Sequence, residues 1–326
     1  MSKVLLTGAA GFVGSHIAEA LSAAGYSVIC AVKKTSNLKW LKRLPVKYEY
    51  GSLDDKDFLN RIVKDVDFIV HCAGIVRALD KEEYFKNNTV ITADLCRAVI
   101  ENNDSLKKFI FISSQAAMGP SSVERIRNVS DVPEPISDYG LSKIEAETQL
   151  KRILCGKIPY TVFRPAAVYG PRDKDIFIFF NLVHRHLRPV TVKKRFLQLI
   201  YVKDIARCVL SCFWNINTGN KTYYIADPSV YTWSDIGRII SLSSGVRSLP
   251  LPVPDFVFKT AGFVMERLSK ITGKPAVLNK QKVSEILQNS WTADTVSAEN
   301  ALNIKFTCLE IASKITYNWY LENNWF

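Results

Sequence analysis

The sequence lacks the usual signatures of a metal-binding protein and of a disulfide-linked secreted protein. Its seven cysteines are scattered and include no Cys-x-x-Cys pair. Cys208 and Cys212 lie four residues apart, and His184 and His186 lie two apart, but no third or fourth ligand follows at a suitable spacing. Because the chain also starts without a signal peptide, we expect reduced thiols, no metal and a cytoplasmic location.

A membrane span and a nucleic-acid surface are missing as well. The longest apolar segment, residues 253–268, contains Asp255, Lys259, Glu266 and Arg267, so it is too short and too charged to cross a bilayer. It could instead form an amphipathic helix that lines a substrate cavity or touches a membrane surface. The net charge is +12, but no aromatic residues are interleaved with the basic ones in the way that stacks on bases. We therefore expect no nucleic-acid partner and interpret the basic residues as a solvated surface.

Strands and helices alternate along the first half of the chain. An apolar strand at 3–7, a glycine-rich turn, a helix at 12–24 and a second strand at 26–32 form a βαβ unit. The alternation continues with strands at 47–50, 66–70, 108–112 and 160–164, and with helices at 56–63, 84–102 and 139–154. Repeated βα units predict an α/β fold with a doubly wound parallel sheet, a Rossmann domain.

After Pro171 the pattern changes to helix-rich segments, short strands and proline-rich joints. A helix at 202–213 and a strand at 222–226 are expected to return to the sheet. The predicted Rossmann domain therefore comprises residues 1–171 and 202–227, and a smaller, helix-rich substrate-binding domain comprises 172–201 and 228–326. Aromatic residues of this second part could line an apolar pocket or build ordinary core: Phe256, Phe258, Phe263, Trp291, Tyr317 and Trp319.

The segment between the first strand and helix is rich in glycine, with Gly8, Gly11 and Gly14 in a Gly-x-x-Gly-x-x-Gly spacing. Missing side chains at such a turn let the backbone approach a pyrophosphate held at the helix N-terminus. A tight turn with close helix packing is the alternative. The first gap is one residue wider than in the usual dinucleotide fingerprint.

The residues that end the second strand bear on the choice of cofactor. An acidic side chain there binds the ribose hydroxyl of NAD, whereas a cation accommodates the extra phosphate of NADP. This chain has Val32-Lys33-Lys34 and no carboxylate. NADP is therefore favoured over NAD, with Lys33 as the contact and Lys34 or Lys39 as helpers, unless these lysines merely lie on a solvated loop.

Tyr139 and Lys143 are four residues apart, which places a phenol and an ammonium on one face of a helix. A cation beside a phenol favours the phenolate and is expected to lower the tyrosine pKa. Ser113 and Ser114 follow the strand at 108–112, at the sheet edge where open α/β sheets bind their ligands. A serine hydroxyl there can hydrogen-bond a reacting oxygen.

With these features the chain resembles an extended short-chain dehydrogenase/reductase, a family also labelled NAD-dependent epimerase/dehydratase, over nearly its whole length. The resemblance is carried by the glycine turn and by further motifs: His71-Cys-Ala-Gly74, Asn88, Ser114, Tyr139 with Lys143, Arg164-Pro-Ala-Ala-Val-Tyr-Gly-Pro171 and Tyr201-Val-Lys-Asp204.

The resemblance implies a role for each matching residue. Tyr139 is the general acid/base, Lys143 binds the nicotinamide ribose and tunes Tyr139, and Ser114 polarises the substrate oxygen. Around the pyrophosphate, the resemblance implies contacts from Gly8, Gly11, Phe12, Val13 and Gly14, and at the adenine from Ser52 and Leu53. It places Ala73 and Gly74 along the cofactor and Pro165 and Val168 near the nicotinamide. Asn88 is expected to order the central strands and the site.

Two departures from the family pattern bear on the substrate. Relatives usually carry an Asp at the adenine, where this chain has Ser52, with Asp54 nearby. Members that act on nucleotide sugars usually have Gln-Arg-Asp just before the Tyr-Val-x-Asp segment, whereas this chain has the apolar stretch 196–200. That stretch has no arginine to bind a substrate diphosphate, although the side chain of Arg195 could reach the same place. The sequence is closer to dihydroflavonol-reductase-like and hydroxysteroid-dehydrogenase-like members.

The leading hypothesis is hydride transfer between a nicotinamide and an alcohol or ketone of a small, apolar substrate. One alternative is a nucleotide-sugar epimerase or dehydratase that retains NAD, and another is a catalytically silent sensor or scaffold. By analogy with the family, the helices at 84–102 and 139–154 could form a homodimer interface.

Overall fold

Seven parallel strands form the central sheet of the computed structural model, which describes residues 1–326. The spatial order of the strands is β11-β6-β5-β4-β1-β2-β3. Their bounds are β1 Lys3–Thr7, β2 Ser27–Val32, β3 Lys47–Tyr50, β4 Phe68–His71, β5 Lys108–Ile112, β6 Tyr160–Pro165 and β11 Lys221–Ile225. The strand order reverses between β1 and β4, and ligands of doubly wound sheets bind at such a switch point, beyond the carboxyl ends of the strands.

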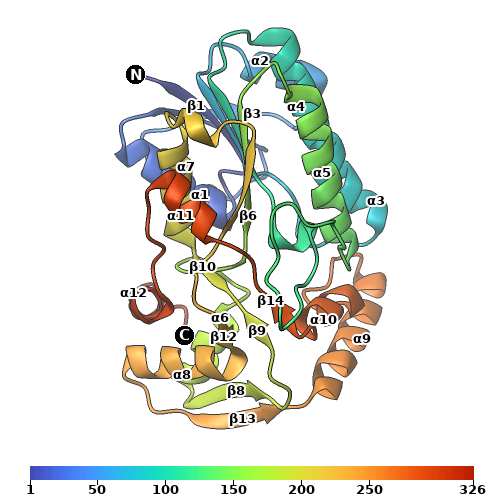
Figure 1. Cartoon of the computed structure of the whole chain (residues 1–326), viewed down its shortest axis with the longest axis vertical. Helices are drawn as coiled ribbons and strands as arrows, with labels where there is room; N and C mark the ends of the chain where they lie inside the picture. Colours follow the sequence, from blue (N-terminus) through green and yellow to red (C-terminus); the bar gives the residue numbers. More distant parts are fainter.

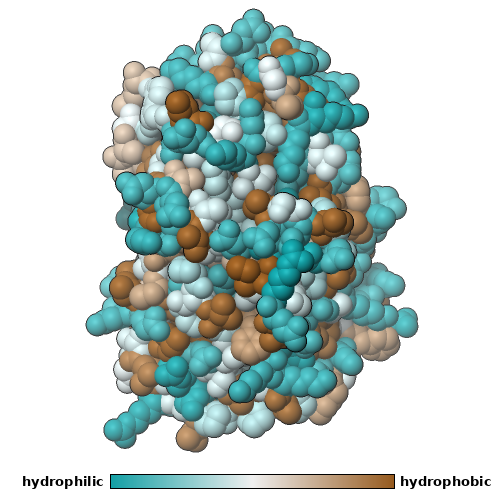
Figure 2. Space-filling model, viewed as in Figure 1, coloured by the Kyte–Doolittle hydropathy of each residue, from teal (hydrophilic) through white to brown (hydrophobic).

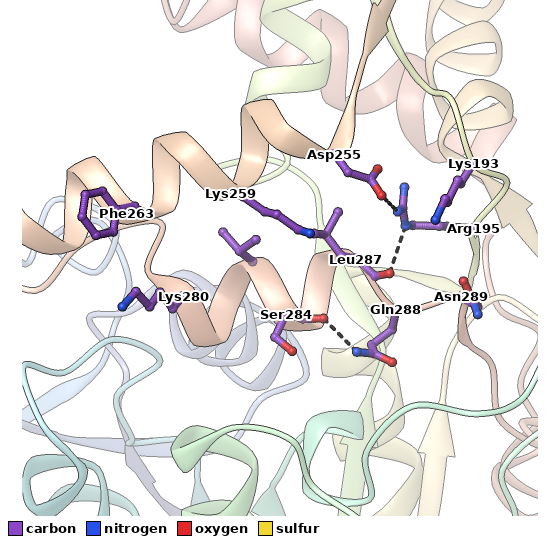
Figure 3. Close-up of a pocket in the computed structure, with 11 residues that line it drawn as sticks. Lys193, Arg195, Asp255, Lys259, Phe263, Lys280, Ser284, Leu287, Gln288 and Asn289 are labelled. Atoms are coloured by element: carbon purple, nitrogen blue, oxygen red, sulfur yellow. Dashed lines mark hydrogen bonds and ion pairs between the residues drawn. The ribbon is translucent and has the colours of Figure 1, made fainter.

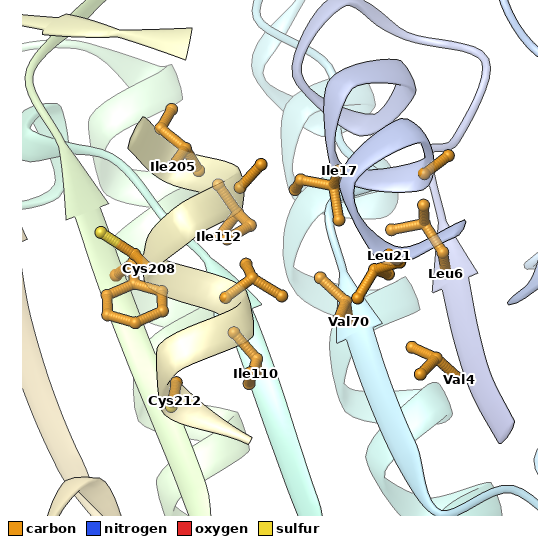
Figure 4. Close-up of a cluster of buried hydrophobic side chains, with 14 of the residues drawn as sticks. Val4, Leu6, Ile17, Leu21, Val70, Ile110, Ile112, Ile205, Cys208 and Cys212 are labelled. Carbon is orange, nitrogen blue, oxygen red and sulfur yellow. The ribbon is translucent and has the colours of Figure 1, made fainter. Parts of the chain in front are cut away.

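Helices cover both faces of this sheet (Figure 1). Apolar side chains of α1 (Phe12–Ala23) and α7 (Val202–Cys212) pack on one face, and those of α2 (Lys56–Ile62), α4 (Ile91–Asn102) and α5 (Asp138–Leu154) pack on the other. Figure 4 shows Ile17 and Leu21 of α1 and Ile205 of α7 among side chains of the strands. The fold class predicted from the alternation of elements, a doubly wound Rossmann sheet, is confirmed.

The C-terminal part is built from helices and short strands around its own apolar cluster. Short strands pair as β7 (Ala167–Tyr169) with β10 (Leu199–Tyr201), as β9 (Phe196–Leu197) with β12 (Tyr231–Thr232) and β14 (Ser290–Trp291), and as β8 (Leu187–Thr191) with β13 (Leu249–Val253). The helices are α6 Phe177–His184, α8 Trp233–Ser244, α9 Asp255–Thr272, α10 Lys280–Ile286, α11 Val296–Leu302 and α12 Leu309–Glu322.

Several element boundaries differ from the sequence-based prediction. The expected helix at 84–102 starts earlier, as α3 (Lys81–Tyr84), because the Asp80 side chain accepts a hydrogen bond from the Glu83 N–H. It then passes through a π-helical turn, Phe85–Val90, before α4. The division into two domains stays a prediction, and α11, assigned to the second domain, packs in the same cluster as α1 and α7.

None of the helices is both long enough and apolar enough to cross a bilayer. The face seen in Figure 2 mixes hydrophobic and hydrophilic side chains. All seven cysteines are free, and no group of three or more His, Cys, Asp or Glu side chains is placed to hold a metal.

Candidate active site

The glycine turn packs closely against the chain that follows β4. Gly8 has a φ of +72°, and a Cβ at Gly8 would lie 2.6 Å from the Ala73 nitrogen. A Cβ at Gly14 would lie 2.1 Å from the Gly8 oxygen. Helix α1 begins after Gly11 without a side-chain cap, so no capping side chain competes with a ligand for its first N–H groups. These residues fit the pyrophosphate of a dinucleotide.

A buried histidine ties β1 and β4 to α4 beneath this turn. His71 lies 2.7 Å from the Thr7 hydroxyl and 3.0 Å from the Thr92 hydroxyl. The Thr7 hydroxyl in turn accepts a hydrogen bond from the Ala73 N–H. Burial, with a smaller effect of the Lys143 charge, lowers the pKa of His71 to about 3, so the imidazole is neutral. Sequence analysis missed Thr7 and Thr92 because only the fold brings them to His71.

His71 therefore makes the stability of the protein depend on pH. Because the unfolded state takes up the proton near pH 6.5 and the folded state only near pH 3, stability falls as the pH drops through this window. Between pH 7.5 and pH 5 we expect His71 to account for a loss of about 2 kcal/mol. Urea unfolding at both pH values measures the free energy of unfolding. The loss of stability between pH 7.5 and pH 5 should be smaller in His71→Gln than in the wild type. It should be unchanged in the control His186→Gln, since His186 is exposed. An unchanged loss in His71→Gln would contradict this assignment.

Asn88 holds the loop after β4 against α5. Its Oδ1 accepts a hydrogen bond from the Ile75 N–H at 2.8 Å, and its Nδ2 donates to the Ile75 oxygen and to the Ser142 hydroxyl. A Cβ at Gly74 would lie 2.8 Å from Asn88 Oδ1 and 3.8 Å from Lys143 Nζ. The structure therefore brings together Gly74, Asn88 and Lys143, residues that the sequence places far apart.

Tyr139 lies at the start of α5, beside Ser114 at the carboxyl end of β5. Ser114 also begins a 3₁₀ turn, where its hydroxyl accepts a hydrogen bond from the Ala116 N–H. Burial raises the pKa of Tyr139 to about 12, although a hydrogen bond with Ser114 acts in the opposite direction. The expected lowering of this pKa is therefore wrong for this structure. Desolvation of the phenol outweighs the hydrogen bond with Ser114, and the phenol is protonated at neutral pH.

Lys143 is one helical turn from Tyr139 and is buried. Its Nζ donates to the Ile112 oxygen at 2.9 Å and lies 4.4 Å from the centre of the Phe111 ring. Burial lowers the pKa of Lys143 to about 8, although the charges of Cys72 and Glu147 act in the opposite direction. The ammonium is thus held at the carboxyl end of β5.

Helix α10 lies over the N-terminal end of α5. Glu285 accepts a hydrogen bond from the Ser137 hydroxyl at 2.5 Å, and Gln281 bonds both the N–H and the carboxylate of Asp138. Glu285 is also among the charges that raise the Tyr139 pKa. Sequence analysis gave no role to these α10 residues, because nothing in their spacing indicates contact with residues 137–139.

The residues predicted to select the cofactor lie where β2 and β3 end side by side. Lys33 is exposed, and its positive charge is one of the effects that lower the pKa of Asp54, after a hydrogen bond from Ser52. Lys86 also approaches Asp54, at 4.0 Å. Leu53 packs against the apolar cluster under α2. The structure thus groups Lys33, Ser52 and Asp54 at the predicted adenosine end.

The remaining predicted contacts lie where the sheet meets the C-terminal part. Pro165 ends β6 and pairs with Ile225 of β11. Val168 of β7 and Val13 of α1 both pack against the sheet cluster and against the C-terminal cluster, and Phe12 packs against the latter. These side chains are therefore placed between the glycine turn and the second part of the chain.

The predicted aromatic lining of a pocket does not form from the six residues proposed. Phe256 and Phe263 are largely exposed, whereas Tyr317 is buried beside His184. Trp319 contacts Trp40. The six residues belong to different elements that face different neighbours. The ordinary-core alternative holds for Tyr317, whereas Phe263 lines a cavity.

A cavity of about 560 Å³ lies between β9, α9 and α10 (Figure 3). Arg195 is buried there, with its Nη2 2.8 Å from Asp255 and its Nε donating to the Leu287 oxygen. Its Nη1 has no partner. Lys193, Lys259 and Lys280 also line the cavity, which is therefore strongly cationic.

The parallel sheet, the glycine turn and the Ser114, Tyr139 and Lys143 cluster define a Rossmann-fold enzyme built for a nicotinamide dinucleotide. The model of the NAD dependent epimerase/dehydratase family matches residues 4–226, and the chain belongs to this family.

The similar proteins point to more than one activity within that family. The chain is 26% identical to a ceramide reductase of Caulobacter vibrioides over 99% of this chain and 95% of that protein. It is also 26% identical to a UDP-glucose 4-epimerase of Vibrio cholerae, over 90% and 89% of the two chains. A UDP-glucuronic acid 4-epimerase of Bacillus cereus, solved with UDP-glucuronic acid and NAD, superposes with a TM-score of 0.76 at 22% identity, covering 98% of this chain and 99% of that one. The likeness to that structure confirms the fold.

Proposed function

We propose that the protein is an NAD(P)H-dependent reductase that acts on a ketone of an apolar, lipid-like substrate. The geometry that carries the proposal is the Tyr139 phenol hydrogen-bonded with the Ser114 hydroxyl at the carboxyl edge of the sheet. A protonated phenol is suited to give its proton to an oxygen that becomes negative during the reaction. Tyr139 can therefore protonate the oxygen of a ketone as it is reduced.

A nicotinamide cofactor would supply the hydride when bound. Ser114 hydrogen-bonds the substrate oxygen, and Tyr139 donates its proton to the same oxygen. Lys143, held by the Ile112 oxygen, keeps a positive charge close to this group as negative charge develops. The uncapped start of α1 and the glycine turn would hold the pyrophosphate, and Asn88 keeps the loop at Gly74 in the place where it would line the cofactor.

An apolar substrate is supported by the residues that precede α7. Leu197 and Leu199 lie where a nucleotide-sugar enzyme would place a cation, and Arg195 is already held by Asp255 and the Leu287 oxygen. The similarity to a ceramide reductase extends over almost the whole chain. Both points favour a ceramide-class lipid ketone as the substrate.

A nucleotide-sugar epimerase is the second candidate, because the cationic cavity beside α10 has the charge to hold a diphosphate. The two functions differ in the fate of the cofactor. A reductase consumes one NAD(P)H for each ketone reduced, whereas an epimerase retains its NAD and consumes none. We would add long-chain keto-amide lipids in detergent, or UDP-sugars, to the purified protein and follow absorbance of the reduced nicotinamide. Turnover of a UDP-sugar without net oxidation would overturn the reductase proposal.

The preference for NADP is a separate proposal, based on Lys33. Lys33→Asp should weaken NADPH binding by about tenfold or more, because a cation is replaced by a charge that repels the 2′-phosphate, and should leave NADH binding unchanged or stronger. Titration by nicotinamide fluorescence would measure both affinities after any co-purified cofactor has been removed. Lys47→Asp, on β3, is a control of equal charge change. Tighter binding of NADH than NADPH by the wild type would contradict the proposal.

A homodimer through α4 and α5 and a cytoplasmic location also stay predictions. Leu141 of α5 is partly exposed, as an interface residue of the unassembled chain would be. Light scattering of the purified protein would give its oligomeric state directly.

A further inference from the structure

Helix α9 turns much of its apolar side chain surface away from the protein. Only Gly262 and Ser269 of its 18 residues are buried. Large apolar side chains of α9 are exposed by 41% to 81%: Phe256, Val257, Phe263, Val264, Leu268 and Ile271. Helices of globular proteins normally turn such residues to the core, so this surface calls for a partner.

The six exposed side chains share one face of the helix. At 100° per residue they fall within an arc of about 140°, opposite Gly262 and Ser269, which face the protein. Helix α9 lies at the lower right margin of the molecule in Figure 1, next to α10 and away from the central sheet. An apolar stripe of one helix is therefore freely accessible along its whole length.

Positive charge accompanies the stripe. Between Asp255 and Lys282 the chain has six lysines or arginines and two acidic residues. One of the two, Asp255, is neutralised by Arg195, and the other, Glu266, accepts a hydrogen bond from the Lys280 N–H. The Arg267 and Lys280 cations lie 5.2 and 5.6 Å from the centre of the Phe263 ring. Arg267 falls within the arc of the apolar side chains, so the stripe contains one cation.

We propose that α9 is a membrane-docking helix that lies in the interface of an anionic lipid bilayer, with its apolar stripe among the acyl chains and its cations at the headgroups. An amphipathic helix of this charge binds such surfaces through buried apolar area and electrostatic attraction together. No helix can span the bilayer, so the contact is peripheral. A second copy of the chain is a less suitable partner for this face. Pairing two α9 helices would bring Arg267, Lys270 and Lys274 of both copies together, and these like charges would repel one another.

The docking surface is independent of the chemistry at Tyr139, and its test needs no substrate. The full-length protein is sedimented with vesicles of phosphatidylcholine alone and of phosphatidylcholine mixed with phosphatidylglycerol. We expect binding to the anionic vesicles that weakens as salt is raised. Phe263→Ser with Ile271→Ser should bind at least about tenfold more weakly, since each apolar side chain contributes substantially to partitioning. Ile216→Ser with Leu242→Ser, which removes two exposed apolar side chains elsewhere, should bind as the wild type does.

A local measurement separates docking at α9 from general adhesion of a basic protein. Hydrogen exchange of residues 255–272 should slow when anionic vesicles are added and should not slow in the α9 double variant. Equal melting temperatures would show that both variants are folded. No binding to anionic vesicles, or equal binding by the α9 variant and the wild type, would overturn the proposal. So would a dimer that dissociates in the α9 variant without any vesicle binding, because a second copy would then be the occupant.

Discussion

Replacing Tyr139 by Phe is expected to reduce turnover by about 10²- to 10⁴-fold, which is the usual contribution of a positioned proton donor. The ring stays in place beside Tyr84, whose ring centre is 6.2 Å away, so the fold and the cofactor site should be unaffected. The measurement is single-turnover oxidation of NAD(P)H with a saturating ketone, together with a cofactor titration. Affinity for the cofactor should change little, because only one hydroxyl is removed.

Tyr84→Phe is the matched control for this experiment. It removes a buried phenol next to Tyr139 whose hydroxyl donates to the Val76 oxygen at 3.4 Å. We expect near-normal turnover in this variant. If Tyr139→Phe turned over at the wild-type rate, or if both variants were equally impaired, Tyr139 would not be the proton donor.

The largest expected effect on stability is at the buried ion pair of Glu147 and Arg164. Arg164 donates from Nε and Nη2 to the two carboxylate oxygens at 3.0 and 2.6 Å, and the Ser113 hydroxyl donates to one of them. Arg164→Met leaves a buried carboxylate without its bidentate partner and should destabilise the protein by about 3–5 kcal/mol. Urea unfolding at neutral pH measures the change.

Two further variants make this prediction specific. Arg97→Met removes the exposed partner of Asp94 and should cost less than about 1 kcal/mol. Replacing Arg164 and Glu147 together by Met should recover much of the lost stability, because no unpaired charge remains. A loss below about 1 kcal/mol in Arg164→Met would show that water or Lys151, whose Nζ lies 3.5 Å from the Glu147 carboxylate, takes over the role of the arginine.

The same pair contributes to stability in a defined pH range. Burial raises the pKa of Glu147, but the hydrogen bonds and charge of Arg164 outweigh it, and the pKa ends below its ordinary value. A carboxyl group with a lowered pKa stabilises the fold above its unfolded-state pKa, and this contribution is lost as the pH falls through the folded-state pKa. Glu147 and His71 therefore both favour neutral over acidic conditions.

Sequence reasoning succeeded where a local pattern has one structural solution. The strand, glycine turn and helix at residues 3–24 form as predicted because continuous apolar runs and a glycine spacing constrain the backbone locally. The Tyr139 and Lys143 spacing on one helix was likewise readable, since helical geometry is fixed. The family assignment that rested on these motifs is confirmed.

Sequence reasoning failed where the outcome depends on which groups surround a side chain. The pKa of Tyr139 rises instead of falling because desolvation, which no spacing encodes, is the largest effect on the phenol and outweighs its hydrogen bond with Ser114. The six C-terminal aromatic residues separate into core and surface because their elements pack in different directions. The branch of the family and the choice between NADP and NAD stay predictions for the same reason.

The sequence by itself determined the Rossmann fold, the glycine turn and the pair of groups on α5, because each depends on contacts within a few residues or on simple periodicity. Only the tertiary structure decided that His71 lies between two threonines, that α10 covers the start of α5 and that α9 faces outward. Those facts depend on contacts between segments far apart in the chain, whose geometry follows from packing the whole molecule.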